Sequence, residues 1–144
     1  MLNEKEKHIL QCLRKNGRCS VTKLAKQLQC SRNTVLQKLN KLENSNMFHK
    51  HTCLLNFNNI GYPIHAKVLF KLDNPNDNFA EELVKNKNTN NVLKLGNRYD
   101  ILVSFVFRKM EHFHTYMDYL NNNFSIKESK IYYITDELKR EGFY

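Results

Sequence analysis

Three short amphipathic helices are predicted in the first third of the chain, where apolar positions recur every three or four residues. An Asn3-x-x-Glu6 capping box begins the first helix, and Gly17 is its expected stop. Ser20 and Ser31 are placed to cap the second and third helices. The second and third helices are therefore expected to have the spacing of a helix-turn-helix.

The third predicted helix, over residues 31–43, has two different sides. Its core side is expected to carry four apolar residues: Val35, Leu36, Leu39 and Leu42. The opposite side carries amide and cationic side chains: Arg32, Asn33, Gln37, Lys38 and Lys41. Because such groups bind base edges and phosphates, this division predicts a DNA recognition helix.

Two short extended segments, 47–50 and 52–57, follow this helix and could form a small hairpin, or wing. A turn-rich connector at 58–63 comes next. We therefore expect a first domain over residues 1–57 and a second over residues 64–144.

The second half of the chain changes from a helical to a strand-like period. Alternation from Ile64 to Leu72 predicts a strand, and a helix is expected around residues 79–84. The remaining predicted elements are strands at 92–95 and 99–107, a helix at 110–124 and a strand at 126–134. This order is β-α-β-β-α-β, the ferredoxin-like arrangement of a four-stranded antiparallel sheet. The predicted fold class is α+β, a winged helix-turn-helix followed by a ferredoxin-like domain.

One face of that sheet should carry no helix, yet apolar residues are expected on it. Leu69, Leu102 and Val106 fall there by alternation, and Ile131 and Tyr133 could join them. A sheet with apolar residues on its uncovered face usually packs against a copy of itself. We therefore expect a homodimer formed through the sheet domain, the alternative being that these residues fill one protomer's own core.

The net charge of +9 is unevenly distributed. Residues 1–61 contain 11 Lys/Arg against Glu4, Glu6 and Glu43, whereas residues 62–144 contain 12 against 11 acidic residues. A basic half beside a neutral half indicates a polyanion-binding module, and double-stranded DNA is the expected partner. No basic face is paired with apolar membrane anchors, no apolar run could span a bilayer and no secretory signal opens the chain, so a cytoplasmic protein is expected.

The four cysteines all lie in the basic half, without a C-x-x-C pair. No metal or cofactor is expected, and thiols in a reducing compartment are the simplest interpretation. Two alternatives remain open. His49-x-His51-x-Cys53 could place three ligands on one side of a strand, and Cys19 and Cys30 could form a redox pair around the second helix.

Base readout is assigned to Arg32, Asn33 and Gln37, because Arg suits guanine and Asn or Gln suit adenine. The expected phosphate contacts come from both helices of the motif and from the wing. They are Lys23, Ser31, Lys38 and Lys41, with His49, Lys50 and His51 from the wing. Ser20, Thr22 and Thr34 complete the expected interface.

The ordered motifs resemble the Lrp/AsnC family of prokaryotic transcription regulators over nearly the whole chain. The likeness rests on the opening helix, on Ser31-x-x-Thr34-Val35-x-x-Lys38-Leu39, on Ile60-Gly61-Tyr62 and on a loop from Gly96 to Asp100. The loop is one residue longer than is common in the family, and Gln29 stands where many such turns have glycine.

The resemblance implies a dimer formed by the sheet domain, with tetramers or octamers built from dimers, and a small effector, commonly an amino acid, bound between sheet domains. It places the effector at the loop Gly96, Asn97, Arg98, Tyr99 and Asp100, with Gly96 allowing backbone approach and Asp100 facing an amine.

Two other classes of function are alternatives to a DNA-binding regulator that is not an enzyme. Siroheme decarboxylases are similar to this family in architecture, but the loop has Arg98 and Tyr99 and no histidine. A module that senses an effector without binding DNA is the third hypothesis, and the basic first domain disfavours it.

Overall fold

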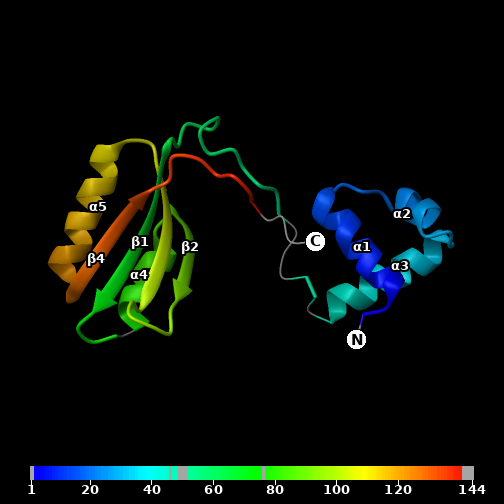
Figure 1. Ribbon diagram of the computed structural model, residues 1–144, viewed down its shortest axis with the longest axis horizontal. Helices are drawn as coiled ribbons and strands as arrows, with labels where there is room; N and C mark the ends of the chain where they lie inside the picture. Colours follow the sequence, from blue (N-terminus) through cyan, green and yellow to red (C-terminus); the bar gives the residue numbers. More distant parts are fainter. Residues whose placement is uncertain (1, 46, 49–51, 76, 141–144) are drawn as a thin grey trace. The chain divides into compact units, whose positions relative to one another are not determined.

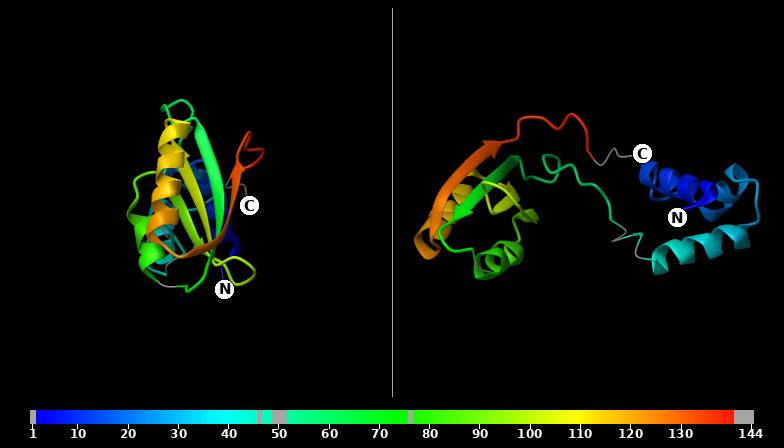
Figure 2. Two further views of the ribbon diagram at one scale, coloured as in Figure 1. Left: turned by 90° about the vertical axis from the view of Figure 1, so that its left-hand side faces the viewer. Right: turned by 60° about the horizontal axis from the view of Figure 1, so that its bottom comes forward.

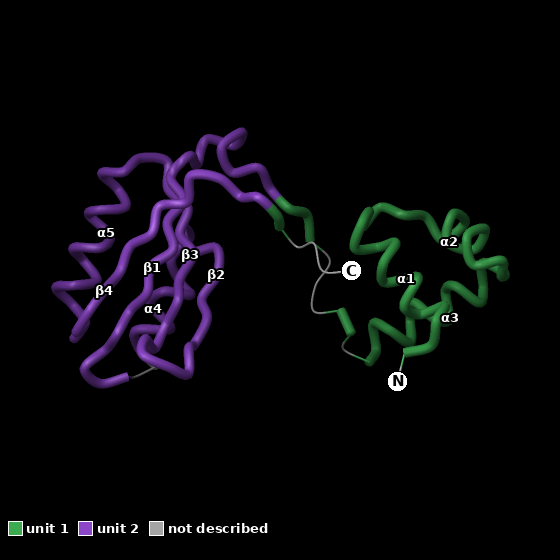
Figure 3. The backbone as a smooth tube through the Cα atoms, in the orientation of Figure 1, with its two compact units in different colours: residues 1–54, 139–144 green, residues 55–138 purple. Residues whose placement is uncertain are grey.

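The computed structural model describes residues 2–45, 47–48, 52–75 and 77–140 (Figure 1). The chain forms two compact units, one of residues 1–54 with 139–144 and the other of residues 55–138 (Figure 3). None of the helices in the described ranges is long and apolar enough to cross a membrane.

The first unit contains α1 (Glu4–Lys15), α2 (Val21–Gln27) and α3 (Arg32–Asn44). The side chains that were expected to cap them do so. The Asn3 side chain accepts from the Glu6 N–H at 2.9 Å, while the Glu6 carboxylate accepts from the Asn3 N–H at 2.9 Å. Ser20 and Ser31 accept from the backbone N–H three residues later, at 3.2 and 3.1 Å. Asn16 caps the C-terminus of α1, one residue before the expected Gly17.

The turn between α2 and α3 depends on one residue in the left-handed region. Gln29 has φ 49°, a conformation that favours glycine, and Cys30 donates its N–H to the Ala25 carbonyl at 3.1 Å. A tight turn of this kind brings the two helices together. A small core then forms from all three helices: Ile9, Leu24, Ala25, Val35 and Leu42.

Two assignments on α3 were wrong. Leu36 is 44% exposed and does not belong to the core side, because it lies about 100° around the helix from Val35. Lys38 lies four residues before the buried Leu42 and therefore on the same side as that residue. Only 21% of the Lys38 side chain is exposed.

The expected wing is only partly within the described residues. Residues 47–48 and 52–57 form no strand, and residues 49–51 lie outside the described part of the chain. Residues 58–61 form a turn that ends at Gly61, whose φ of 83° requires the freedom of glycine.

The second unit is a four-stranded antiparallel sheet with two helices. The strands are β1 (Ile64–Leu72), β2 (Thr89–Lys94), β3 (Ile101–Phe107) and β4 (Ile126–Tyr133), in the spatial order β2-β3-β1-β4. The helices are α4 (Asp77–Lys85) and α5 (Met110–Asn123), which lie on the same side of the sheet (Figures 1 and 2). The predicted βαββαβ arrangement is confirmed.

Aromatic side chains fill the space between the sheet and its helices. Phe70 of β1 packs edge-on against Phe79 of α4, with ring centroids 5.1 Å apart. Phe107 of β3 and Phe113 of α5 make a similar contact at 5.6 Å. These four rings are at most 4% exposed, so the helix-covered side of the sheet is a continuous apolar core.

The uncovered side of the sheet carries a row of three leucines. Leu93 pairs with Leu102, and Leu102 pairs with Leu69. Ile131 and Tyr133 do not extend this row, because they pair with Val68 and Ala66, which lie on the helix-covered side. On β4, the uncovered face carries Lys130 and Tyr132 in place of Ile131 and Tyr133.

Truncation of a core ring should destabilise the second unit. We expect Phe113→Ala to lower the free energy of unfolding by about 3–5 kcal/mol, because Phe113 is fully buried and its loss leaves a cavity. Denaturant titration followed by tyrosine fluorescence measures this, since six of the seven tyrosines lie between residues 62 and 133. The exposed His112→Ala on the same helix should change the free energy by less than about 0.5 kcal/mol. A loss below about 1 kcal/mol for Phe113→Ala would contradict the assigned core.

Candidate DNA interface and effector loop

The exposed side of α3 is a stripe of amides. Its members are spaced by four, three and four residues and so lie one above another along the helix: Asn33, Gln37, Asn40 and Asn44. Each side chain is exposed and presents both a donor and an acceptor. A pair of such groups matches the N6 and N7 edge of adenine in the major groove.

Leu36 and Arg32 lie beside this amide stripe. Leu36 is a large apolar side chain that α3 leaves exposed, and an apolar contact suits the thymine methyl group. Arg32 is exposed at the first position of the helix, where it can reach a guanine or a phosphate. Leu36, Asn40 and Asn44 were not among the residues expected from the sequence to contact DNA, although the 3–4 spacing of the amides was a signal for the last two.

The expected phosphate contacts lie around the N-termini of α2 and α3. Ser20, Thr22 and Lys23 are exposed in the first turn of α2. Ser31 is exposed, and its hydroxyl lies 2.9 Å from that of the partly buried Thr34. Backbone N–H groups and the dipoles at helix N-termini favour anions, so these positions suit phosphate.

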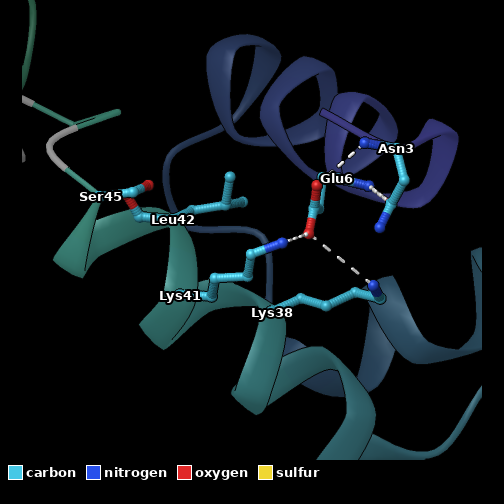
Figure 4. Close-up of polar contacts among 6 residues, drawn as sticks. All are labelled: Asn3, Glu6, Lys38, Lys41, Leu42 and Ser45. Carbon is cyan, nitrogen blue, oxygen red and sulfur yellow. Dashed lines mark hydrogen bonds and ion pairs between the residues drawn. The ribbon is translucent and has the colours of Figure 1, made fainter. Parts of the chain in front are cut away.

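Lys38 and Lys41 both face Glu6 of α1 (Figure 4). Lys41 Nζ lies 2.8 Å and Lys38 Nζ 4.0 Å from Glu6 Oε1, while the other carboxylate oxygen accepts from the Asn3 N–H. Glu6 is 1% exposed, the only buried charged residue of the described ranges. The Lys41 side chain remains 67% exposed. These two lysines are therefore paired with a buried carboxylate and do not extend freely from the helix.

The Lys41 hydrogen bond keeps the pKa of Glu6 below its ordinary value, helped by the Asn3 N–H and opposed by burial. A lowered pKa means that the folded first unit favours the carboxylate form. The stabilisation is present above the ordinary pKa of a glutamate and is lost as the pH falls through the lowered value. Around neutral pH, Glu6 is therefore fully charged and paired.

The remaining candidates in this unit are its histidines and thiols. His49, Lys50 and His51 lie outside the described residues, so the structure does not place the expected wing contacts. Within the described ranges, no group of three metal-ligating side chains is close enough to hold an ion. Cys12, Cys19 and Cys30 are half-buried against the core of the three helices, and Cys53 is exposed.

The loop at residues 96–100 joins β2 to β3. Its Asp100 carboxylate accepts the Leu72 N–H at 2.8 Å and lies 3.4 Å from Lys71 Nζ. The Asp100 backbone also donates to the Phe70 carbonyl at 2.9 Å. Asp100 therefore fastens the loop to the end of β1, and both of its oxygens are occupied. Gly96 has open space around the position of a Cβ, which leaves its backbone accessible.

Tyr99 reaches past the end of β1 to β4. Its hydroxyl donates to Glu128 Oε1 at 2.8 Å, and the guanidinium of Arg98 lies 3.5 Å from the other carboxylate oxygen. Arg98 and Lys130 lie over the Tyr99 ring, at 5.6 and 5.8 Å from its centroid. The Tyr99 hydrogen bond is the main cause that lowers the pKa of Glu128. The loop thus ends in a charged cluster of Arg98, Tyr99, Glu128 and Lys130.

Residues 2–47 match the family of winged helix-turn-helix DNA-binding domains. An HTH-type transcriptional regulator of Pyrococcus horikoshii is 31% identical over 111 residues, which cover 76% of this chain and 75% of that protein. Another from Pyrococcus abyssi is 26% identical over 142 residues, covering 98% and 97% of the two chains.

Solved structures share the fold over nearly the whole length of the chain. The Neisseria meningitidis transcriptional regulator in complex with L-Met has a TM-score of 0.88 at 22% identity, with 97% and 94% of the chains covered. LrpC of B. subtilis has a TM-score of 0.87 at 15% identity, covering 96% and 98%. AsnC of E. coli has a TM-score of 0.85 at 15% identity, covering 97% and 96%. This chain belongs to the HTH-type transcriptional regulators, and its fold is that of the Lrp/AsnC regulators. The resemblance expected from the sequence is confirmed.

In this regulator, the hydroxyl of Tyr99 should control the ionisation of Glu128. We expect Tyr99→Phe to raise the pKa of Glu128, because the substitution removes the main hydrogen bond to its carboxylate. Carbon-detected NMR titration of the carboxyl groups measures the change. Tyr132→Phe removes a hydroxyl from β4, the strand that contains Glu128, and should leave the pKa of Glu128 unchanged. An unchanged Glu128 pKa in Tyr99→Phe would contradict the assigned contact.

Proposed function

We propose that this chain is a sequence-specific, homodimeric DNA-binding regulator that reads pseudo-palindromic sites and responds to a small effector. The observation that carries the proposal is the amide stripe of α3, exposed along the whole helix in a unit with a strong positive charge. Two such helices, one from each protomer, would enter successive major grooves of one site.

Base readout is assigned to the exposed side of α3. Asn33 and Gln37 are proposed to bind adenine, Arg32 to bind guanine, and Leu36 to contact a thymine methyl group. Asn40 and Asn44 lie further along the same stripe and would extend the contact. The phosphates would be bound at the N-termini of α2 and α3, by Ser20, Thr22, Lys23, Ser31 and Thr34.

Dimerisation is proposed to occur through the uncovered face of the sheet. Leu93, Leu102 and Leu69 cross three strands in one row, and Leu93 is 48% exposed. A contiguous apolar row on an open sheet face is stabilised when a second copy covers it. Tetramers or octamers built from such dimers are proposed as well, as the family resemblance implies.

An amino acid is proposed as the effector, bound at the loop of residues 96–100. The exposed Arg98 guanidinium would exchange Glu128 for the carboxylate of the ligand, and the Glu128 oxygen that Arg98 leaves would receive the amine. Gly96 and Asn97 would offer exposed backbone groups. Asp100 is assigned to fastening the loop, because its oxygens already have partners. The L-Met complex of the Neisseria regulator supports this class of ligand.

The relatives are named as transcriptional regulators, and we propose that this chain likewise has no catalytic role. An electrophoretic mobility shift with the promoter region of the protein's own gene tests the proposal. We expect a discrete shifted band that random DNA does not compete away at equal concentration. Equal competition by random DNA would contradict sequence-specific binding.

Gln37→Ala should weaken binding to a specific site by about 1–3 kcal/mol and leave binding to random DNA nearly unchanged. The reason is that a base contact discriminates between sequences, whereas a phosphate contact does not. Fluorescence anisotropy on the two duplexes measures both affinities. Gln11→Ala on the exposed side of α1 is the matched control and should change neither. Equal losses on both duplexes would exclude base readout by Gln37.

Leu102→Glu should convert the dimer to a monomer, because the charge would lie at the centre of the leucine row. Sedimentation velocity measures the mass, and circular dichroism confirms that the variant folds. Val84→Glu introduces the same charge on α4, at a residue that is 68% exposed, and should leave the dimer intact. A folded Leu102→Glu protein with the mass of the wild type would contradict an interface on this face.

A further inference from the structure

Most of the positive charge of α3 is paired within the protein. The helix has three cationic residues, Arg32, Lys38 and Lys41, and two of them face the carboxylate of Glu6. Lys38 is mostly buried beside that carboxylate, while Lys41 bridges to it across the surface of the unit. Lysines on a recognition helix would ordinarily be expected to bind DNA phosphates.

A lysine that binds a phosphate would have to give up its ion pair with Glu6. The carboxylate is 1% exposed, and a buried charge that loses its partner is strongly destabilising. A lysine that stays with Glu6 contributes little to phosphate neutralisation, which is the main source of affinity for random DNA. The pairing therefore weakens phosphate binding, the part of the affinity for DNA that does not depend on sequence.

We propose that Glu6 is a specificity-determining positioning residue, which pairs with Lys38 and Lys41 of α3, keeps them away from the phosphates and thereby lowers affinity for random DNA relative to specific sites. The inference rests on the proposed DNA-binding function. It assigns a role in recognition to a residue of α1 that lies outside the helix-turn-helix. It also replaces the phosphate contacts expected for Lys38 and Lys41 from the sequence.

The geometry makes Lys41 the lysine that Glu6 controls most. Its Nζ lies 2.8 Å from the carboxylate, yet two thirds of its side chain is exposed, so the ion pair rather than packing fixes its direction. Lys38 is fixed by burial as well, with Nζ at 4.0 Å. Removal of the charge on Glu6 should therefore release Lys41 first.

Glu6→Gln tests the role of that charge. Glutamine at this position can still complete the capping box with Asn3, so α1 keeps its N-terminal cap. The salt dependence of binding to a random duplex, measured by fluorescence anisotropy, should steepen by about 0.9 in log–log slope for each released lysine. Affinity for random DNA at low salt should rise on the order of tenfold, and the ratio of specific to random binding should fall.

Glu4→Gln is the matched control. It removes the same charge from the same turn of α1, but Glu4 pairs with Lys7 of its own helix, at 2.7 Å, and not with α3. Its salt slope should equal that of the wild type. Equal steepening by both substitutions would show a general charge effect and would overturn the proposal.

Lys41→Met completes the test. In the wild-type background it should leave the slope unchanged, and in the Glu6→Gln background it should remove most of the added slope. A flatter slope for Lys41→Met alone would mean that Lys41 binds phosphate in the wild type, and the proposal would fail. This single variant decides the question if circular dichroism shows that Glu6→Gln does not fold.

A wild-type chain that binds no DNA would overturn both the proposed function and this role, whereas binding with identical slopes in all variants would overturn only the role of Glu6.

Discussion

The ion pair between Glu6 and Lys41 joins residues that are 35 positions apart in the chain and ties α3 to α1. The core beneath α3 is small, with five buried apolar residues from three short helices. This core, with the half-buried apolar residues packed around it, fixes which side of α3 is buried. A buried carboxylate that requires a cation from α3 adds a directional constraint. The exposed side of the helix then presents the amide stripe.

The second unit has a different physical basis and a separate task. Its stability comes from aromatic packing between the sheet and the helices α4 and α5, with Phe70, Phe79, Phe105 and Phe113 fully buried. The uncovered face instead carries the row of three leucines, and charged groups gather at the loop of residues 96–100. The core occupies the helix-covered side of the sheet, whereas a second copy of the chain and a ligand are proposed to bind at the uncovered face and at the loop.

Local signals in the sequence predicted the elements well. Asn3, Ser20 and Ser31 each cap the helix that was expected, because a capping side chain acts within three residues. The alternation of Ile64–Leu72 likewise matched β1. The face of the sheet on which each residue lies was harder to predict. Ile131 and Tyr133 were candidates for the uncovered face but lie on the other side of β4, because the alternation of a half-buried edge strand shows its period but not which set of residues faces inward.

The contacts that fix the sites could not be predicted from spacing. Asp100 was expected to face a ligand, and the Leu72 N–H that occupies its carboxylate lies 28 residues earlier in the chain. Glu6 was recognised as part of a cap, and only the fold brings Lys41 to it. Both carboxylates have partners that the tertiary structure supplies, whereas the exposed amides of α3 follow from helical geometry alone.

Selection of bound duplexes from a random DNA pool tests the central claim, that α3 reads sequence as one of a symmetric pair. We expect an enriched motif of two inverted half-sites, with centres about 10–10.5 base pairs apart or a multiple of that spacing, and with adenines where the amide stripe meets the bases. A pool that remains random after selection, although the protein binds it, would contradict sequence reading by α3.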